Sequence, residues 1–196
     1  MVKDRIILGI DPGTMVMGYS LILEKDKHIS LLRMGVLKLK QYDNQALKLK
    51  KIFERVLEII EEYHPDELAI EAPFYGKNVQ SMLKLGRAQG VAMAAALYRG
   101  IPIFEYSPRR IKQSITGNGG ASKEQVALML QNIVKFDALP EFLDATDATA
   151  VAVCHHFQHS INIENGTTTK TIKIPKGKKS FNSWSSFIEN NPDKIV

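Results

Sequence analysis

Four acidic residues stand at the borders of hydrophobic segments that are far apart in the sequence. Asp11 and Glu71 each end a short apolar run, whereas Asp144 and Asp147 come just before one. Carboxylates that rigid elements hold close together repel one another unless a cation lies between them, and hard divalent cations prefer such oxygen ligands. These residues therefore predict a site for Mg²⁺ or Mn²⁺, with two ions per active site as in enzymes of phosphoryl transfer.

The spacing of these residues is compatible with one shared site. Asp144 and Asp147 are three residues apart, so on a helix their side chains lie on the same face. Asp11 and Glu71 would be held at the ends of two strands. Four carboxylates carry four negative charges, which two divalent ions would balance. His155 lies a little over two helical turns beyond Asp147, so we expect it to pack or to face solvent rather than to bind the same metal.

Each acidic residue, taken singly, also has a simpler explanation. Asp144 and Asp147 would cap a helix and stabilise its positive end. Asp11, which Pro and Gly follow, would suit a turn. Glu71 is harder to explain in this way, because it follows an apolar run directly. The coincidence of all four favours the metal site.

The apolar runs predict the elements that must position these residues. We expect strands at 5–11, 18–24 and 28–39, a helix at 46–63, a strand at 67–71, a helix at 78–99, a strand at 101–106, helices near 109–116 and 122–134, and a last helix from about 144 to 159. The break at Asp26-Lys27 indicates a hairpin, and Ser122 with Gln125 has the spacing of a capping box. This order predicts an α/β fold with a mixed five-stranded sheet flanked by helices.

The composition is that of an ordinary globular domain. The 196 residues are 44% hydrophobic and 24% charged, which suits a single core. The single cysteine, Cys154, excludes an internal disulfide and a cysteine-based zinc cluster. No apolar run has the length of a signal peptide core or of a membrane span, so we expect a cytoplasmic protein without a membrane partner. The formal charge of +5 is compatible with a polyanionic partner.

The last part of the chain has a different character. Residues 161–196 contain six lysines against three acidic residues, and they include Phe181, Trp184 and Phe187. We therefore expect one folded domain at 1–160 and a basic C-terminal extension at 161–196 that is partly disordered.

Several short motifs follow one another in a fixed order. They are ILGIDPG at 7–13 with Gly18-Tyr19, Ile70-Glu71, KLGRAQGVA at 84–92, Ser107-Pro108 with IKQS at 111–114, and DATDA at 144–148 leading into AVA at 150–152. Together they resemble the RuvC family of Holliday-junction resolvases, which have an RNase H-like fold. A DPG tripeptide alone is a weak signal, but the ordered set from about Ile6 to Phe157 is specific.

The resemblance implies a function as well as a fold. It implies that Asp11, Glu71, Asp144 and Asp147 are the catalytic and metal-binding acids of a structure-specific DNA endonuclease. It further implies a homodimer that makes paired symmetric incisions in four-way junction DNA, leaving 5′-phosphate and 3′-hydroxyl ends. By the same resemblance the protein would act in DNA recombination and repair, beside the RuvA–RuvB branch-migration complex.

Candidate DNA contacts follow from the loop after Glu71 and from the resemblance. Phe74 and Tyr75 stand in this loop, where exposed aromatic rings could stack on unpaired bases, although Phe74 could equally pack in the core. The resemblance places Phe74 at a junction-wedging position. Lys112 and Lys123 correspond in it to basic residues near the scissile phosphate or the DNA backbone. Lys77 would extend the positive surface.

Three other functions remain open at this point. A catalytically idle nucleic-acid binder on the same fold would be expected to lack one of the four acids. A nucleotide-binding ATPase of the actin and sugar-kinase group would need a second phosphate loop and usually a longer chain. An RNase H-fold nuclease that acts on RNA differs from a junction enzyme in its substrate, and only a comparison of substrates separates the two.

Overall fold

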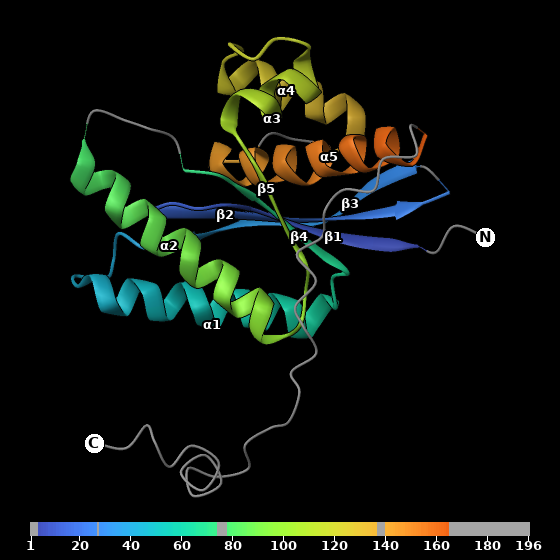
Figure 1. Cartoon of the computed structure of the whole chain (residues 1–196). Helices are drawn as coiled ribbons and strands as arrows, with labels where there is room; N and C mark the ends of the chain where they lie inside the picture. Colours follow the sequence, from blue (N-terminus) through green and yellow to red (C-terminus); the bar gives the residue numbers. More distant parts are fainter. Residues whose placement is uncertain (1–3, 27, 74–77, 137–139, 165–196) are drawn as a thin grey trace, which may run out of the picture.

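The structure, a computed structural model, describes residues 4–26, 28–73, 78–136 and 140–164 (Figure 1). Its elements are β1 (Arg5–Asp11), β2 (Val16–Lys25), β3 (His28–Lys38), α1 (Gln45–Tyr63), β4 (Glu67–Glu71), α2 (Val79–Tyr98), β5 (Ile103–Tyr106), α3 (Pro108–Thr116), α4 (Lys123–Val134) and α5 (Leu143–Glu164). Their order and type agree with the prediction from the sequence. The bounds differ most at α5, which continues to Glu164 instead of ending near His159.

The five strands form one mixed sheet in the order β3-β2-β1-β4-β5. β1 pairs with β2, and β2 with β3, in antiparallel fashion, whereas β4 runs parallel to both β1 and β5. Lys25 pairs with His28 across the predicted hairpin, where Asp26 adopts a left-handed φ of 49°. The mixed sheet expected from the sequence is therefore confirmed, and β1 lies at its centre.

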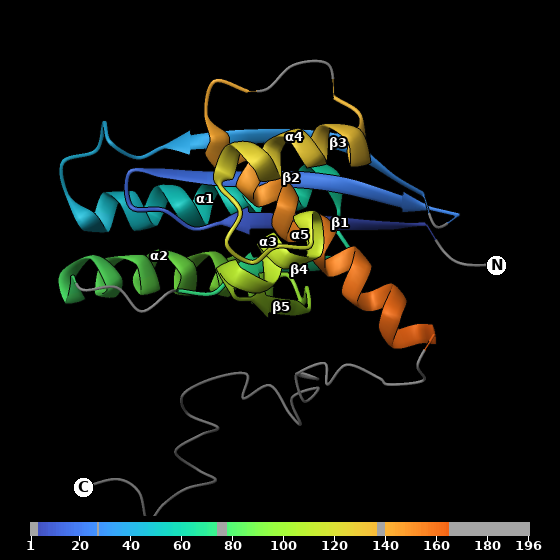
Figure 2. The same cartoon turned by 90° about the horizontal axis from the view of Figure 1, so that it is seen from above.

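Helices cover both faces of the sheet. Figures 1 and 2 show α1 and α2 on one face and α3, α4 and α5 on the other. The central strand supplies both cores, because Leu8 and Ile10 pack with α1 and α2 while Ile7 packs with α3, α4 and α5. This alternation is what a strand with two buried faces requires.

Helix α5 lies unusually close to the sheet, and two glycines make this possible. A Cβ atom at Gly9 would lie 2.2 Å from the carbonyl oxygen of Ala148, and one at Gly18 would lie 1.9 Å from that of Asp144. Any other residue would force the helix away, since these contacts are with backbone atoms that cannot rotate aside. The absence of two side chains thus brings the start of α5 down onto β1 and β2.

Local sequence signals set the helix ends. Asn44 caps α1 by accepting a hydrogen bond from the Leu47 N–H, and His64 ends this helix with a left-handed φ of 48°. The capping box predicted at Ser122 and Gln125 is present, with both of its hydrogen bonds. Among the described residues, no helix is long and apolar enough to cross a membrane. The predicted basic extension lies outside them, apart from residues 161–164 at the end of α5.

Candidate metal centre

The sheet topology brings two of the four predicted acids to the same edge. β1 and β4 are parallel neighbours in which Ile10 pairs with Ile70, so the next residues, Asp11 and Glu71, follow at the same level. Both strands are fixed along their length by ladder hydrogen bonds and buried side chains. Two carboxylates that are 60 positions apart in the sequence are therefore held at adjacent strand ends.

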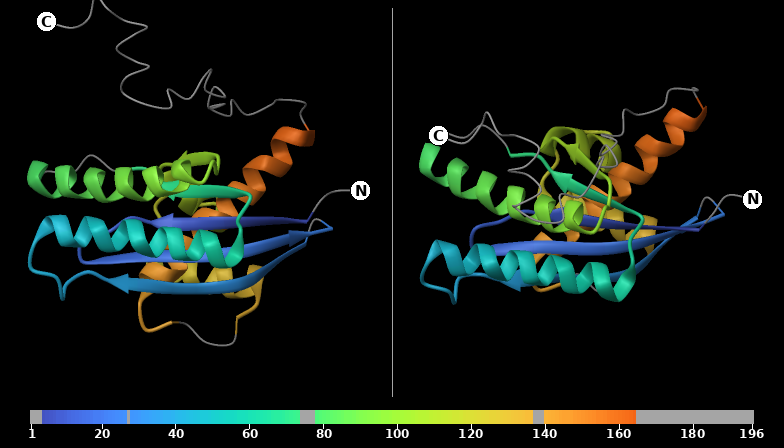
Figure 3. Two further views of the ribbon diagram at one scale, coloured as in Figure 1. Left: turned by 90° about the horizontal axis from the view of Figure 1, so that it is seen from below. Right: turned by 60° about the horizontal axis from the view of Figure 1, so that its bottom comes forward.

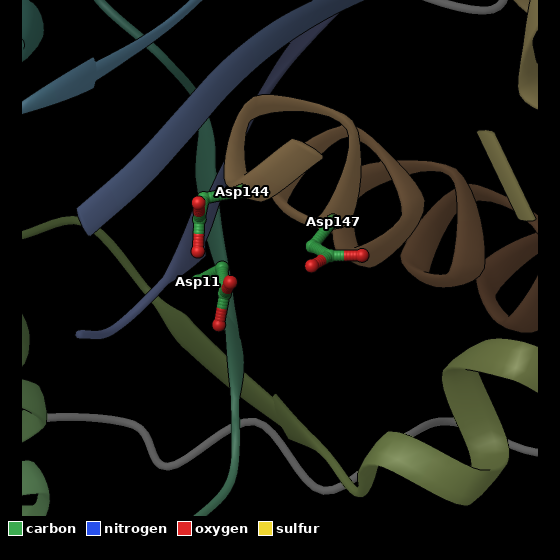
Figure 4. A group of neighbouring side chains, drawn as sticks. All are labelled: Asp11, Asp144 and Asp147. Atoms are coloured by element: carbon green, nitrogen blue, oxygen red, sulfur yellow. The ribbon is translucent and has the colours of Figure 1, made fainter. Parts of the chain in front are cut away.

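Helix α5 supplies the other two acids from its first turns. Asp144 lies near Asp11 because Gly18, the strand partner of Asp11, touches the backbone of Asp144. Asp11, Asp144 and Asp147 each offer a carboxylate oxygen, and these oxygens all lie within 4.8 Å of one another. Figure 4 shows the three side chains grouped where the start of α5 meets the end of β1. The prediction that both helix aspartates share a face directed at Asp11 is therefore confirmed.

Glu71 completes the group from the side of β4. It lines a cavity of about 200 Å³ together with Asp11, Pro108, Ile111, Lys112, Lys123, Val126, Asp147 and Ala150. Glu71 is not among the three carboxylates within 4.8 Å of one another, but its charge acts on that of Asp11. One cavity thus brings together residues from β1, β4, α3, α4 and α5.

The ionised forms of three of these carboxyl groups, those of Asp11, Glu71 and Asp147, are disfavoured by their surroundings. Burial raises the pKa of Asp11 well above its usual range, and the charges of Glu71 and Asp147 raise it further. Burial and then the charge of Asp147 raise the pKa of Glu71 to about 7. The pKa of Asp147 is also raised by burial, although Lys123 opposes this shift. A hard divalent cation would stabilise the ionised forms of such closely spaced, buried carboxylates, so the residues fit such an ion.

Two lysines reach the same cavity. Lys123, in the first turn of α4, forms an ion pair with Asp147. Burial works to lower the pKa of Lys123, but the hydrogen bond to Asp147 and the negative charges around it outweigh burial, so this pKa is raised. Lys112, on α3, lines the cavity and works to lower the pKa of Glu71. Both lysines that the resemblance selected therefore lie at the acidic cluster.

A buried glutamine behind Glu71 was not predicted as a functional residue. Gln89 on α2 is only 5% exposed, and its Nε2 donates to the Glu71 carbonyl oxygen at 3.4 Å and to Glu105 Oε2 at 2.8 Å. It links α2 to the end of β4 at the residue that carries the acid. Gln89 belongs to a motif of the sequence, but a contact of this kind with a backbone carbonyl has no signal in the sequence.

The remaining predicted residues divide into two groups. Phe74, Tyr75 and Lys77 lie outside the described residues. His155, in contrast, is buried and bonded to Glu67 and Tyr106, and it does not line the acidic cavity. This agrees with the expectation that it packs rather than binds the metal.

The chain is similar to proteins of known family over most of its length. The family model described as crossover junction endodeoxyribonuclease RuvC matches residues 7–155. The protein of that description from Cytophaga hutchinsonii is 58% identical over 194 residues, covering 98% of this chain and 88% of the relative. Its counterpart from Christiangramia forsetii is 56% identical over 193 residues, covering 98% of this chain and 94% of the relative.

A solved structure resembles the fold as well. The chain matches T. thermophilus RuvC in complex with Holliday junction substrate with a TM-score of 0.75 and 30% sequence identity. The match covers 81% of this chain and 96% of that one. The resemblance of sequence therefore extends to the arrangement of strands and helices that holds the acidic cluster.

Proposed function

Because this chain belongs to the RuvC family of crossover junction endodeoxyribonucleases, we propose that it resolves four-way (Holliday) junctions by paired symmetric incisions in DNA. The solved relative with a TM-score of 0.75 is bound to such a junction, which supports this substrate for the present chain. Its natural setting would be DNA recombination and repair.

The acidic cavity is the observation that carries the proposal. Asp11, Glu71 and Asp147 line it, and Asp144 stands within 4.8 Å of Asp11 and Asp147. A binding module would gain nothing from carboxylates in the path of a polyanion, since they repel phosphate and raise one another's pKa. A nuclease gains metal ligands from the same arrangement.

Each residue would have a separate role in the reaction. Asp11, between Glu71 on the neighbouring strand and the two aspartates of α5, would hold the metal ions together with these three acids. Lys112 and Lys123 would hold oxygens of the scissile phosphate at the rim of the cavity. Two bound Mg²⁺ or Mn²⁺ ions would supply an activated water and stabilise the departing 3′-oxygen, so that the products carry 5′-phosphate ends.

Recognition of the junction would involve surfaces outside the cavity. We propose that Phe74 wedges between bases at the crossover, as the family resemblance implies, that Tyr75 stacks on bases from the same part of the chain, and that Lys77 extends the positive surface. A homodimer would match two active sites to the two-fold symmetry of a junction. The RuvA–RuvB branch-migration complex would be the protein partner, and the cytoplasmic location and the separate extension at 161–196 remain predictions from the sequence.

A comparison of substrates tests the proposal. The purified protein is incubated with a mobile four-way junction, a matched linear duplex and an RNA–DNA hybrid, each with Mg²⁺, Mn²⁺ or EDTA. We expect paired nicks in the junction alone, which DNA ligase can seal and which EDTA abolishes. Light scattering should give twice the mass of the 22.0-kDa chain.

Two outcomes would overturn parts of the proposal. Binding of the junction without cleavage in either metal would indicate a binding module. A preference for the RNA–DNA hybrid would indicate an RNase H-fold nuclease with another substrate.

A further inference from the structure

Three lysines gather beside the metal centre on the side of β3. Lys38 ends β3, Lys40 follows in the connection to α1, and Lys48 lies in the first turn of α1. Figure 3 shows that the end of β3 and the start of α1 lie at one end of the sheet. This end also holds Asp11 and the first turn of α5.

Specific contacts hold the three lysines next to the catalytic elements. Lys38 Nζ lies 4.4 Å from the centre of the Phe142 ring, just before the first turn of α5. The backbone N–H of Lys40 donates to the carbonyl oxygen of Met15 at 3.1 Å. Lys48 Nζ donates to the carbonyl oxygen of Thr14 at 3.4 Å. Thr14 and Met15 belong to the loop that follows Asp11, so each lysine is tied to a segment adjoining one of the acids.

These lysines differ from others in their lack of acidic partners. Within residues 4–26, 28–73, 78–136 and 140–164, none of the three is in an ion pair, whereas Lys25, Lys50, Lys51 and Lys123 each pair with a carboxylate. Lys38 and Lys40 are exposed to solvent and Lys48 is half-buried. The ammonium groups of Lys38 and Lys48 contact neutral groups, a ring and a carbonyl oxygen, and among the described residues no ion pair compensates the positive charge of Lys38, Lys40 or Lys48.

Their position separates them from the lysines of the cavity. Lys112 and Lys123 line the cavity with Glu71 and Asp147, whereas Lys38 lies on β3, two strands away from β1 in the opposite direction to β4. Asp11 pairs with Gly18 and Gly18 with Val36, so Lys38 lies two strands across from Asp11 and two residues further along, roughly 12 Å away. Nucleotides of one DNA strand rise about 3.4 Å each, and this distance therefore corresponds to roughly three nucleotides.

We infer that Lys38, Lys40 and Lys48 form a phosphate-binding surface that grips the DNA backbone a few nucleotides from the scissile bond, on the β3 side. The inference rests on the proposed function. The distance from Asp11 to the end of β3 can be counted in nucleotides from the scissile bond only if the scissile phosphate lies at the acidic cavity. With Lys112 and Lys123 at the cavity itself, the DNA strand is held both at the metal site and a few nucleotides away from it. The three lysines contribute to binding and not to the chemical step.

The test compares two triple variants of equal net charge. The first is Lys38→Gln/Lys40→Gln/Lys48→Gln, and the control is Lys25→Gln/Lys50→Gln/Lys51→Gln, which removes only paired lysines. Junction affinity is measured in EDTA over a range of salt concentrations. The slope of log K against log salt is negative, and each lost phosphate contact reduces its magnitude by about 0.9. We therefore expect the magnitude of the slope to fall by roughly 2 to 3 in the first variant and to stay near the wild-type value in the control.

Kinetics and a charge-conserving variant complete the test. The first variant should raise KM for junction cleavage by about tenfold or more with kcat near the wild-type value, because uniform binding is lost. Lys38→Arg/Lys40→Arg/Lys48→Arg should restore the wild-type slope. The three single Lys→Gln variants are measured as well, so that a folding defect in the triple variant leaves the test intact.

The outcomes separate this inference from the proposed function. Equal slopes in the first variant and the wild type, or equal losses in the first variant and the control, would overturn the lysine surface. A wild-type protein that prefers linear duplex or RNA–DNA hybrid would overturn the proposed junction specificity. The slopes of the variants, measured on that preferred substrate, would still decide whether the lysines bind phosphate.

Discussion

The two ends of the unit formed by β1, β4 and α5 differ in whether their buried carboxylates have positively charged and histidine partners. At the end away from the cavity, Arg5 donates to Glu67 at 2.9 Å and to Glu24 at 2.5 Å. His155 bonds to Glu67 at 2.7 Å and His156 to Glu24 at 2.9 Å. Each glutamate thus has a cation and a histidine beside it, and we call these five residues the compensated cluster.

The same three elements end in carboxylates at the other end. Asp11, Glu71, Asp144 and Asp147 gather there, and among the described residues Lys123 is the one cation that forms an ion pair with any of these four acids. The difference shows in the acids themselves. Burial raises the pKa of Asp11 and Glu71 there.

In the compensated cluster the balance is reversed. Burial works to raise the pKa of Glu24 and Glu67, but hydrogen bonds from the histidines and the charge of Arg5 outweigh it and lower both values. Where buried carboxylates stabilise the fold, the protein therefore gives them hydrogen-bonding and positively charged partners. Of the four acids at the other end, only Asp147 has such a partner among the described residues, and the proposed metal ions would balance the charge of the group.

The largest expected effect comes from removing one acid of the metal centre. Asp11→Asn should lower the rate of junction cleavage by at least about 10³-fold, because the carboxylate holds the metal ions, while junction binding in EDTA survives. The same variant should raise the melting temperature of the metal-free protein at pH 8, since a buried and repelled charge is lost. Single-turnover cleavage and thermal melts measure the two effects, and a variant with near-normal turnover would refute the assignment.

Breaking the compensated cluster should have the opposite consequences. Glu67→Gln leaves His155 without its carboxylate and Arg5 with Glu24 alone, and it should cost about 3 kcal/mol of unfolding free energy, or roughly 6–12 °C in melting temperature. Cleavage below the melting transition should change little. Denaturant titration measures the loss.

A matched control for this prediction lies on the surface. Glu61→Gln breaks an ion pair with Arg99 in which both side chains are largely exposed, so we expect a change within about 0.5 kcal/mol. If Glu67→Gln were as stable as the wild type but slow in cleavage, the compensated cluster would serve cleavage and not the stability of the fold.

A smaller effect is expected at the buried amide behind the metal centre. Gln89→Leu removes the donor to the Glu71 carbonyl oxygen and should weaken the apparent metal affinity in cleavage by about tenfold, as is typical for groups that orient metal ligands. High metal concentration should restore the rate. Gln113→Leu, at an exposed glutamine on α3, serves as the control. An equal loss of rate at every metal concentration would show that Gln89 does not act through the metal.

The smallest effect concerns pH in the absence of metal. Glu71 has its pKa raised from 4.5 to about 7 in the folded protein, so between these values the folded state holds a proton that the unfolded state releases. Stability in EDTA should therefore fall as pH rises through this window, by roughly 5 °C in melting temperature between about pH 5 and pH 8. Thermal melts in Glu71→Gln should show a weaker fall, and a wild-type melting temperature that rises over this window would contradict the prediction.

The compensated cluster should respond to pH with the opposite sign. Because the pKa values of Glu24 and Glu67 are lowered in the folded protein, the stability they contribute is present above their ordinary pKa of 4.5 and is lost as pH falls below it. The Glu67→Gln variant should accordingly lose less stability than the wild type on acidification below about pH 4.

Most of the secondary structure could be predicted because local patterns specify it. The continuous apolar run of β1 and the helical spacing of apolar residues in α1 leave little choice of element, and the capping box at Ser122 marks the start of α4. The four acids could be selected because each stands at an element boundary. The end of α5 was placed too early, because the polar residues after His159 gave no sign that the helix continues to Glu164.

The sequence by itself determined the order of elements, the mixed sheet and the identity of the acids, since each depends on residues close together in the chain or on a resemblance in ordered motifs. Only the tertiary structure decided which side chains meet. The contact of Gly18 with the backbone of Asp144, the bond from Gln89 to Glu71 and the cluster around Arg5 each join distant segments. Such contacts depend on the path of α5 and α2 across the sheet, because packing in three dimensions and not spacing in the sequence sets the distance between them.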